Sequence, residues 1–166
     1  MIAAIVAVDE NWGIGKEGKL LFHIPEDLKF FMKMTRESAV IMGRKTWDSL
    51  PVKPLRDRLN IVVTSGEKGI RNNALFVGLA EAMSILINGS DTDDYLVIGG
   101  ETIYTELLPF CEIIYVTKIF SDGQADRFFP DIEKDDRWMF WDSTSKGEYE
   151  GVKYQFFEYR RNKECQ

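Results

Sequence analysis

The stretch AVIMGRKTW, residues 39–47, joins four apolar residues directly to a glycine and two basic residues. A short apolar run of this kind predicts a strand that is buried on both faces, and the polar residues after Gly43 predict the start of a helix. The segment YLVIGGETI, residues 95–103, repeats the pattern. Strands that pass through glycine into helices are typical of βα units, so the two segments favour an α/β fold with a largely parallel sheet.

The remaining apolar runs extend this alternation along the chain. They predict further strands at residues 2–8, 59–64, 75–77 and 113–119, and helices that begin at Pro25, at residue 79 and at residue 101. Two last strands, at residues 137–141 and 152–159, are separated by the turn-rich residues 145–148. We therefore expect one domain over residues 1–166, with a central, mostly parallel, eight-stranded sheet, an antiparallel C-terminal edge and helices on both faces.

The composition narrows the classes of function. Hydrophobic residues make up 45% and charged residues 29% of the 166 residues, which is typical of a globular protein, and the net charge is -6. This charge argues against nucleic acid and anionic membrane as partners. Cys111 and Cys165 match no metal or redox spacing, and a single histidine, His23, excludes a site of several histidines. With no signal peptide and no apolar run of about 18 residues, we expect a cytoplasmic protein without a metal.

Asp27 is the candidate functional carboxylate. It follows Pro25, which favours the first position of a helix. The spacing i, i+3, i+4 and i+7 predicts a core-facing stripe that consists of Leu28, Phe31, Met32 and Thr35. A carboxylate beside such a stripe is costly unless it is hydrogen-bonded, which suggests a role in chemistry. The alternative is a charge that merely interacts with the helix dipole, and this segment alone leaves both interpretations open.

Two strand ends are candidate sites for an anionic ligand. Glycine at residues 43 and 99–100 lets the backbone approach a ligand, and a helix start offers free N–H groups. Basic and hydroxyl groups accompany the first of them, at Arg44, Lys45, Thr46, Thr64 and Ser65. The spacing fits neither the dinucleotide-binding fingerprint nor a P-loop, and each feature alone is common in proteins without a ligand there. Residues 9–23, with three glycines, predict a long loop that is a candidate lid.

Taken together, these segments resemble the bacterial dihydrofolate reductases. The matching segments, in family order, are Ala7, Gly13-Ile14-Gly15, IPEDLKFF at 24–31, VIMGRKTWDSL at 40–50, VIGG at 97–100, IYVT at 114–117 and FPD at 129–131. The resemblance therefore covers nearly the whole chain. It implies reduction of 7,8-dihydrofolate to tetrahydrofolate with NADPH, by hydride transfer to C6 and protonation of N5, in a monomer that also binds antifolate inhibitors.

The resemblance also implies roles for individual residues. Asp27 would hold the 2-amino group and N3 of the pterin, Thr117 would support Asp27, and Leu20 and Phe22 complete the expected catalytic group. The expected substrate-binding residues are Ile5, Val6, Ala7, Asp27, Leu28, Phe31, Ser49, Leu50, Leu55, Arg58, Ile98, Tyr104 and Thr117. Arg58 matches the arginine that binds the α-carboxylate of the substrate, although Arg56 remains a candidate for this task.

The expected cofactor-binding residues surround the two glycine-bearing strand ends and the candidate lid. They are Ala7, Ile14, Gly15, Gly43, Arg44, Lys45, Thr46, Thr64, Ser65, Ile98, Gly99, Gly100, Glu101, Thr102, Ile103 and Tyr104. Arg44 would favour NADPH over NADH through the 2′-phosphate, and the family holds the Gly99–Gly100 peptide bond in the cis form.

The chain departs from the family pattern at two places. Phe22 stands where many members have a tryptophan, and it cannot donate a hydrogen bond to a water, a task that His23 could take over. Thr102 stands where some members carry an arginine.

Two other functions remain open at this point. A reductase of the same fold that acts on a pyrimidine intermediate of riboflavin synthesis would not need Asp27. A non-catalytic nucleotide-binding module would keep only the phosphate site. The pairing of Asp27 with Arg58 favours the folate enzyme.

Overall fold

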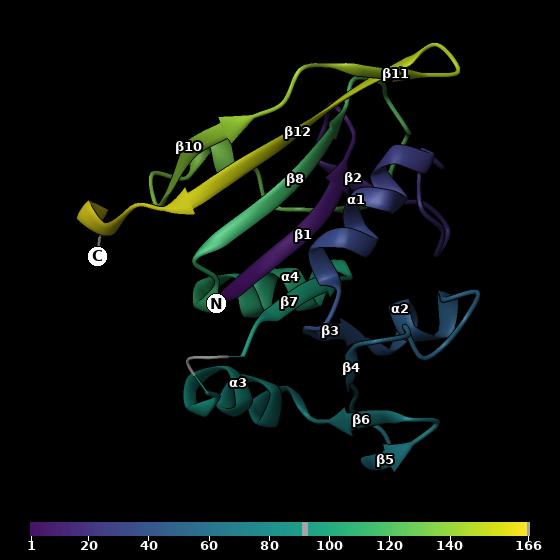
Figure 1. Cartoon of the computed structure of the whole chain (residues 1–166), viewed down its shortest axis with the longest axis vertical. Helices are drawn as coiled ribbons and strands as arrows, with labels where there is room; N and C mark the ends of the chain where they lie inside the picture. Colours follow the sequence, from purple (N-terminus) through teal and green to yellow (C-terminus); the bar gives the residue numbers. More distant parts are fainter. Residues whose placement is uncertain (91–92, 166) are drawn as a thin grey trace.

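The computed structural model describes residues 1–90 and 93–165, which form one large sheet with α-helices packed against it (Figure 1). The strands, in the order in which they lie in the sheet, are β10 (Trp138–Ser143), β12 (Val152–Arg161), β8 (Ile113–Ile119), β1 (Ile2–Val8), β7 (Tyr95–Gly99), β3 (Ala39–Gly43), β4 (Leu59–Val63), β6 (Ala74–Val77) and β5 (Gly69–Arg71), and β11 (Gly147–Tyr149) pairs with β12. The α-helices are α1 (Pro25–Thr35), α2 (Arg44–Ser49), α3 (Leu79–Asn88) and α4 (Glu101–Leu107). Two short strands, β2 (Gly13–Gly15) and β9 (Arg127–Phe128), form a separate pair, and 3₁₀ turns occur at Leu108–Phe110, Ile132–Lys134 and Lys163–Cys165.

The α/β architecture and the mostly parallel sheet are confirmed, but the expected strand count was wrong. The six central strands, from β8 to β6, pair in parallel, and the sheet has ten strands instead of eight. The two additional strands are β5 and β11, each three residues long, and β11 lies partly in the segment expected to be a turn. Both pair antiparallel with a longer neighbour, so the sheet is antiparallel at both edges. Short strands without an apolar run form here because a neighbouring strand supplies their hydrogen bonds.

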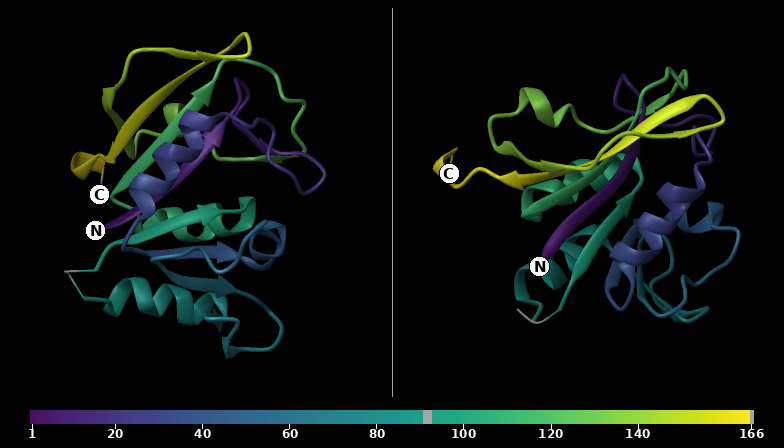
Figure 2. Two further views of the ribbon diagram at one scale, coloured as in Figure 1. Left: turned by 45° about the vertical axis from the view of Figure 1, so that its right-hand side comes forward. Right: turned by 45° about the horizontal axis from the view of Figure 1, so that its top comes forward.

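The alternation of side chains divides the core between two faces of the sheet. In β1, the odd positions Ala3 and Ile5 share a cluster with Phe30 and Phe31 of α1, whereas the even positions pack with residues of α3 and α4 such as Leu107. The two helices α1 and α4 accordingly lie on opposite sides of β1 (Figure 2). Each fully buried aliphatic side chain contributes about 1.5–3 kcal/mol, so this double burial makes the parallel strands a rigid base for the loops at their ends.

The apolar stripe of α1 differs from the prediction by one residue. Leu28 and Met32, expected to face the core, are 51% and 45% exposed. The residues that pack on the sheet include Phe30, Phe31 and Met34. Together with Asp27 they have the spacing i, i+3, i+4 and i+7, so the stripe starts at Asp27 itself. The helix therefore directs Asp27 toward the sheet, while Leu28 and Met32 remain exposed beside it.

The described part of the chain, residues 1–90 and 93–165, contains no helix that is long and apolar enough to cross a lipid bilayer. Cys111 is buried and Cys165 is exposed.

Candidate active site

Asp27 and Thr117 form a hydrogen-bonded pair between α1 and the sheet. Thr117 lies on β8, is 1% exposed, and donates a hydrogen bond from Oγ1 to Oδ1 of Asp27 over 2.7 Å. Burial raises the pKa of Asp27 above its usual range, and the hydrogen bond from Thr117 opposes this rise. A solvated charge at the start of a helix would not show this rise, so the geometry favours the functional interpretation of Asp27.

Tyr104 lies close to this pair and stays protonated. Its hydroxyl donates a hydrogen bond to the carbonyl oxygen of Ile5 over 2.7 Å, and its side chain is buried. Burial, together with the negative charge of Asp27, raises the pKa of Tyr104 far above its usual value. The phenol is therefore a neutral hydrogen-bond donor at any physiological pH, and it brings β1 and α4 together next to Asp27.

Apolar side chains form a surface between α1 and α2. Ile98, on β7, packs both against the cluster around Phe31 and against the cluster that contains Leu50 and Leu55. The predicted apolar wall residues from α1 and from the segment after α2 are thus joined through one strand residue. An apolar surface next to a single carboxyl group suits a ligand that combines a flat polar ring with an apolar body.

Arg58 is fixed against the C-terminal end of α1. Its Nε donates to Thr35 Oγ1 over 2.8 Å and its Nη2 donates to the carbonyl oxygen of Met32 over 2.9 Å, while Nη1 donates to the carbonyl oxygen of Arg56. The side chain of Arg56 is exposed. A guanidinium held in one orientation can bind a carboxylate in bidentate form with little loss of entropy, which favours Arg58 over Arg56 for that task.

At Gly43 and Gly99, two of the glycines at the strand ends, the surroundings leave no room for a side chain. The Gly99–Gly100 bond is cis, as predicted, and Gly99 has φ of +114°. A Cβ atom on Gly99 would lie 2.9 Å from the ring of Tyr104, and one on Gly43 would lie 3.0 Å from Cγ1 of Ile103. Because Gly99 pairs in register with Met42, the two glycine segments are adjacent. This bare backbone fits the close approach of an extended cofactor.

The predicted basic and hydroxyl residues come together at this edge of the sheet. Gly43 pairs with Val63, so the residues after β3 and after β4 are neighbours. Arg44 is exposed and donates from Nε to Asp48 over 3.0 Å, and Oγ1 of Thr64 accepts a bond from the N–H of Gly66 over 3.0 Å. Ser65 and Lys45 are exposed. The edge thus offers cations and hydroxyl groups to an anion beyond the strand ends.

Several predicted site residues have structural contacts of their own. Leu20 is 83% exposed, and Phe22 packs against Ile24 in an apolar cluster that does not include Asp27. His23, the suggested substitute for the missing tryptophan, is exposed. The carboxylate of Glu101 accepts the N–H of Phe128 over 2.9 Å, which ties α4 to β9. Of the remaining predicted residues, Val6 and Ala7 lie on β1, Ile14 and Gly15 on β2, Thr46 and Ser49 on α2, and Thr102 in the first turn of α4.

Sequence reasoning missed the role of Asp9. Its buried carboxylate accepts the N–H of Gly13 over 2.7 Å and that of Gly123 over 2.9 Å. Further along, Asp126 accepts the N–H of Glu17 over 3.0 Å. The expected lid, residues 9–23, is therefore tied to the segment after β8. The available signal was a polar residue that directly follows a buried strand and precedes a glycine by four positions.

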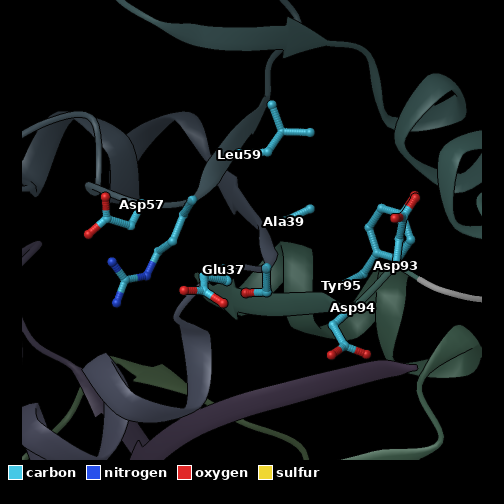
Figure 3. Close-up of a pocket in the computed structure, with 9 residues that line it drawn as sticks. Glu37, Ala39, Asp57, Leu59, Asp93, Asp94 and Tyr95 are labelled. Atoms are coloured by element: carbon cyan, nitrogen blue, oxygen red, sulfur yellow. The ribbon is translucent and has the colours of Figure 1, made fainter.

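A cavity of 390 Å³ lies at the opposite, amino-terminal ends of β3, β4 and β7. Its acidic lining residues are Glu37, Asp57, Asp93 and Asp94, whose carboxylates surround the hollow (Figure 3). The other lining residues are Ser38, Ala39, Arg58, Leu59 and Tyr95. Within the described residues no group of three or more metal-ligating side chains is placed to hold an ion.

Comparison with known proteins identifies relatives over nearly the full length. The model of the dihydrofolate reductase family matches residues 1–161. Dihydrofolate reductase of Bacillus subtilis is 36% identical over 97% of this chain and 95% of its own, and that of Neisseria gonorrhoeae is 36% identical over 95% and 96%. The solved structure of dihydrofolate reductase from Enterococcus faecalis, complexed with NADP(H) and RAB-propyl, superimposes with a TM-score of 0.85 at 32% identity and covers 98% of this chain and 96% of that one.

Proposed function

The chain belongs to the dihydrofolate reductase family, and from this premise we propose that it reduces 7,8-dihydrofolate to 5,6,7,8-tetrahydrofolate with NADPH. The observation that carries the proposal is the Asp27 carboxyl group, which points at the sheet, has a raised pKa, and lies beside an apolar surface. A non-catalytic nucleotide-binding module would not need this group, and the family match sets aside the pyrimidine reductase of riboflavin synthesis.

Asp27 orients the pterin ring in this proposal. An ionised carboxylate accepts two parallel hydrogen bonds, which matches the 2-amino group and N3 of the ring. Thr117 donates a hydrogen bond to one carboxylate oxygen of Asp27, and this bond restricts the rotation of the Asp27 side chain. Because its pKa is raised, Asp27 takes up a proton more readily than an exposed aspartate, and it polarises the ring while N5 is protonated.

The cofactor, when bound, supplies a hydride to C6 of the dihydropterin. The contribution of the protein is to orient the two rings and to exclude water. Gly43, Gly99 and Gly100 would accept the cofactor against the bare backbone, and Arg44, Thr64 and Ser65 would hold its phosphates. Tyr104, whose hydroxyl is bonded to the carbonyl oxygen of Ile5, would lie with Ile5 between the two rings. The loop at residues 9–23 would close over the nicotinamide.

Arg58 anchors the other end of the substrate. Its guanidinium is already oriented by Thr35 and Met32, and Leu28 and Met32 offer exposed apolar surface on the same helix. The aminobenzoyl portion of dihydrofolate would pack there, between Phe31 and Leu50, with its α-carboxylate on Arg58.

The direct test is to mix the purified protein with NADPH and dihydrofolate and to follow the absorbance of the reduced nicotinamide. We expect consumption of NADPH that depends on dihydrofolate and is inhibited by methotrexate. Consumption with the pyrimidine intermediate of riboflavin synthesis instead, or binding of NADPH with no turnover of either substrate, would contradict the proposal.

The remaining expectations stay proposals. We propose that the protein is a single domain and a monomer in the cytoplasm, that it binds neither nucleic acid nor membrane, and that its product supplies one-carbon metabolism. One chain has a mass of 19.2 kDa, and a similar molar mass measured by light scattering would support a monomer.

A further inference from the structure

Two arginine side chains face one aromatic ring beside the proposed phosphate site. Phe76, on β6, is 1% exposed. The guanidinium carbon of Arg71 lies 3.7 Å from the centroid of this ring, and that of Arg44 lies 5.6 Å from it. The sequence motifs marked Arg44 but not Arg71, which is on the short edge strand β5.

The side chain of Arg71 runs along the sheet toward the carboxyl end of β4. Arg71 pairs with Ala74, and because alternate residues of a strand share a face, it lies on the same face as Phe76. Its Nη1 donates to the carbonyl oxygen of Glu67 over 2.8 Å. Glu67 belongs to the segment that begins with Thr64 and Ser65. The charged end of Arg71 therefore reaches the region to which the cofactor phosphates are assigned.

This placement leaves the guanidinium of Arg71 able to bind an anion. A guanidinium has five N–H donors, and the stacked ring and the Glu67 carbonyl fix its plane while most donors stay available. Among the described residues Arg71 forms no ion pair with a carboxylate, whereas Arg44 is paired with Asp48. Two cations against one ring repel each other, and a phosphate monoester with a charge of about -2 would relieve that repulsion.

We propose that Arg71 is a second guanidinium for the 2′-phosphate of NADPH and, with Arg44, determines the preference for NADPH over NADH. This inference rests on the proposed use of NADPH and adds a residue to it. The competing explanation is that Arg71 only covers the face of Phe76, in which case the cofactor would not sense its charge.

The test is direct binding, measured by fluorescence titration without substrate, of NADPH, NADH and adenosine 2′-monophosphate. Arg71→Met keeps a long side chain over Phe76 but removes the charge. We expect this variant to bind NADPH and adenosine 2′-monophosphate about tenfold more weakly, because a charge-assisted hydrogen bond is lost. Its affinity for NADH should change by less than about twofold. Arg71→Lys should recover part of the affinity for both phosphate ligands.

A matched control is Arg137→Gln. Arg137 directly precedes β10, at the opposite edge of the sheet from β5, so it changes the net charge equally without approaching the site. The affinity of the Arg137→Gln variant for NADPH should stay within about twofold of that of the wild type at moderate salt.

Three results would overturn the inference. They are equal weakening of NADPH and NADH by Arg71→Met, unchanged binding of both, and a wild-type protein that binds NADPH and NADH equally well. Failure of the proposed function looks different, since the protein would then bind NADPH selectively but fail to reduce dihydrofolate. If Arg71→Met lowers the melting temperature strongly, Arg71→Gln provides the same comparison, because it also removes the charge while keeping a planar polar group.

Discussion

The proposed substrate side and the proposed cofactor side of the site are built from different parts of the chain. On the substrate side, Asp27 accepts a hydrogen bond from Thr117 of β8, and Arg58 donates one to Thr35 of α1, so each side chain is fixed by a neighbouring element. On the cofactor side, the site consists of glycine backbone and of exposed side chains such as Arg44. We therefore expect the substrate side to depend on the chemistry of single side chains, and the cofactor side to depend on backbone shape and on charges that share one task.

Asp27→Asn should produce the largest effect. The amide keeps the volume of the carboxylate and can still accept the bond from Thr117, but it cannot accept two bonds from the pterin or carry a proton. We expect a loss of roughly 10²–10⁴-fold in kcat/KM for dihydrofolate at neutral pH, with NADPH binding unchanged. Steady-state kinetics measure the loss in kcat/KM, and a separate titration measures the affinity for NADPH. Turnover close to wild type would remove Asp27 from the mechanism.

Gly99→Ala tests the dependence on backbone shape. The new methyl group would lie 2.9 Å from the ring of Tyr104, at a φ of +114° that other residues rarely adopt. Strain of this kind corresponds to roughly 1–3 kcal/mol, so we expect about a 10- to 100-fold loss of NADPH affinity, larger than the loss for dihydrofolate. Gly69→Ala is a control with φ of +118° and no neighbour within 4 Å of the added methyl. Equal losses in the two variants would mean that the contact with Tyr104 is not the cause.

Arg58→Leu tests whether Arg58 binds the α-carboxylate on the proposed substrate side. Because the charge-assisted hydrogen bonds to the α-carboxylate are lost, the binding of dihydrofolate and methotrexate should weaken by about tenfold or more. Diaminopyrimidines such as trimethoprim have no glutamate tail and should bind as before. Arg56→Leu is the matched control, because its side chain is exposed. If only Arg56→Leu shows the selective loss, the anchor has been assigned to the wrong arginine.

Arg44→Ala should have a smaller and selective effect. Arg44 is one of several cations near the proposed phosphate site, and Asp48 already accepts a hydrogen bond from its Nε. We expect KM for NADPH to rise about tenfold and KM for NADH to change little. The double variant Arg44→Ala with Arg71→Met should lose more than either single variant. Equal weakening of both cofactors would show that Arg44 does not recognise the 2′-phosphate.

The smallest expected effect is on stability. Because folding raises the pKa of Asp27, the unfolded chain binds fewer protons at this residue, and the stability from Asp27 is full below its unfolded pKa and falls as pH rises through the folded pKa. Asp27→Asn should therefore unfold at a slightly higher urea concentration than wild type at neutral pH. This advantage should shrink in acid, as the carboxyl group becomes protonated in both states. A variant that is less stable than wild type at neutral pH would show that the ionised form is favoured by folding.

Much of this protein could be predicted from short segments. Apolar runs that end in glycine, at residues 39–43 and 95–100, predicted the parallel core because strand burial and the φ/ψ freedom of glycine are local properties. The same segments, through their family resemblance, indicated Asp27, Arg44 and the cis bond between Gly99 and Gly100. The edge strands β5 and β11 were missed, because their partners, and not their own residues, make them strands.

Only the tertiary structure decided which of these residues act together. The sequence favoured Arg58 and left Arg56 as an alternative, and the hydrogen bonds from Arg58 to α1 separate the two. In α1 the side that faces the sheet starts at Asp27 and not at Leu28. The sequence pattern could not show this, because apolar residues occur both where a helix packs on a sheet and where it is exposed beside the proposed ligand site. Arg71 lies 27 residues from Arg44, yet strand pairing brings both to one ring. Composition and periodicity determine which elements form, whereas contacts between residues distant in the chain depend on strand register, a property of the folded sheet.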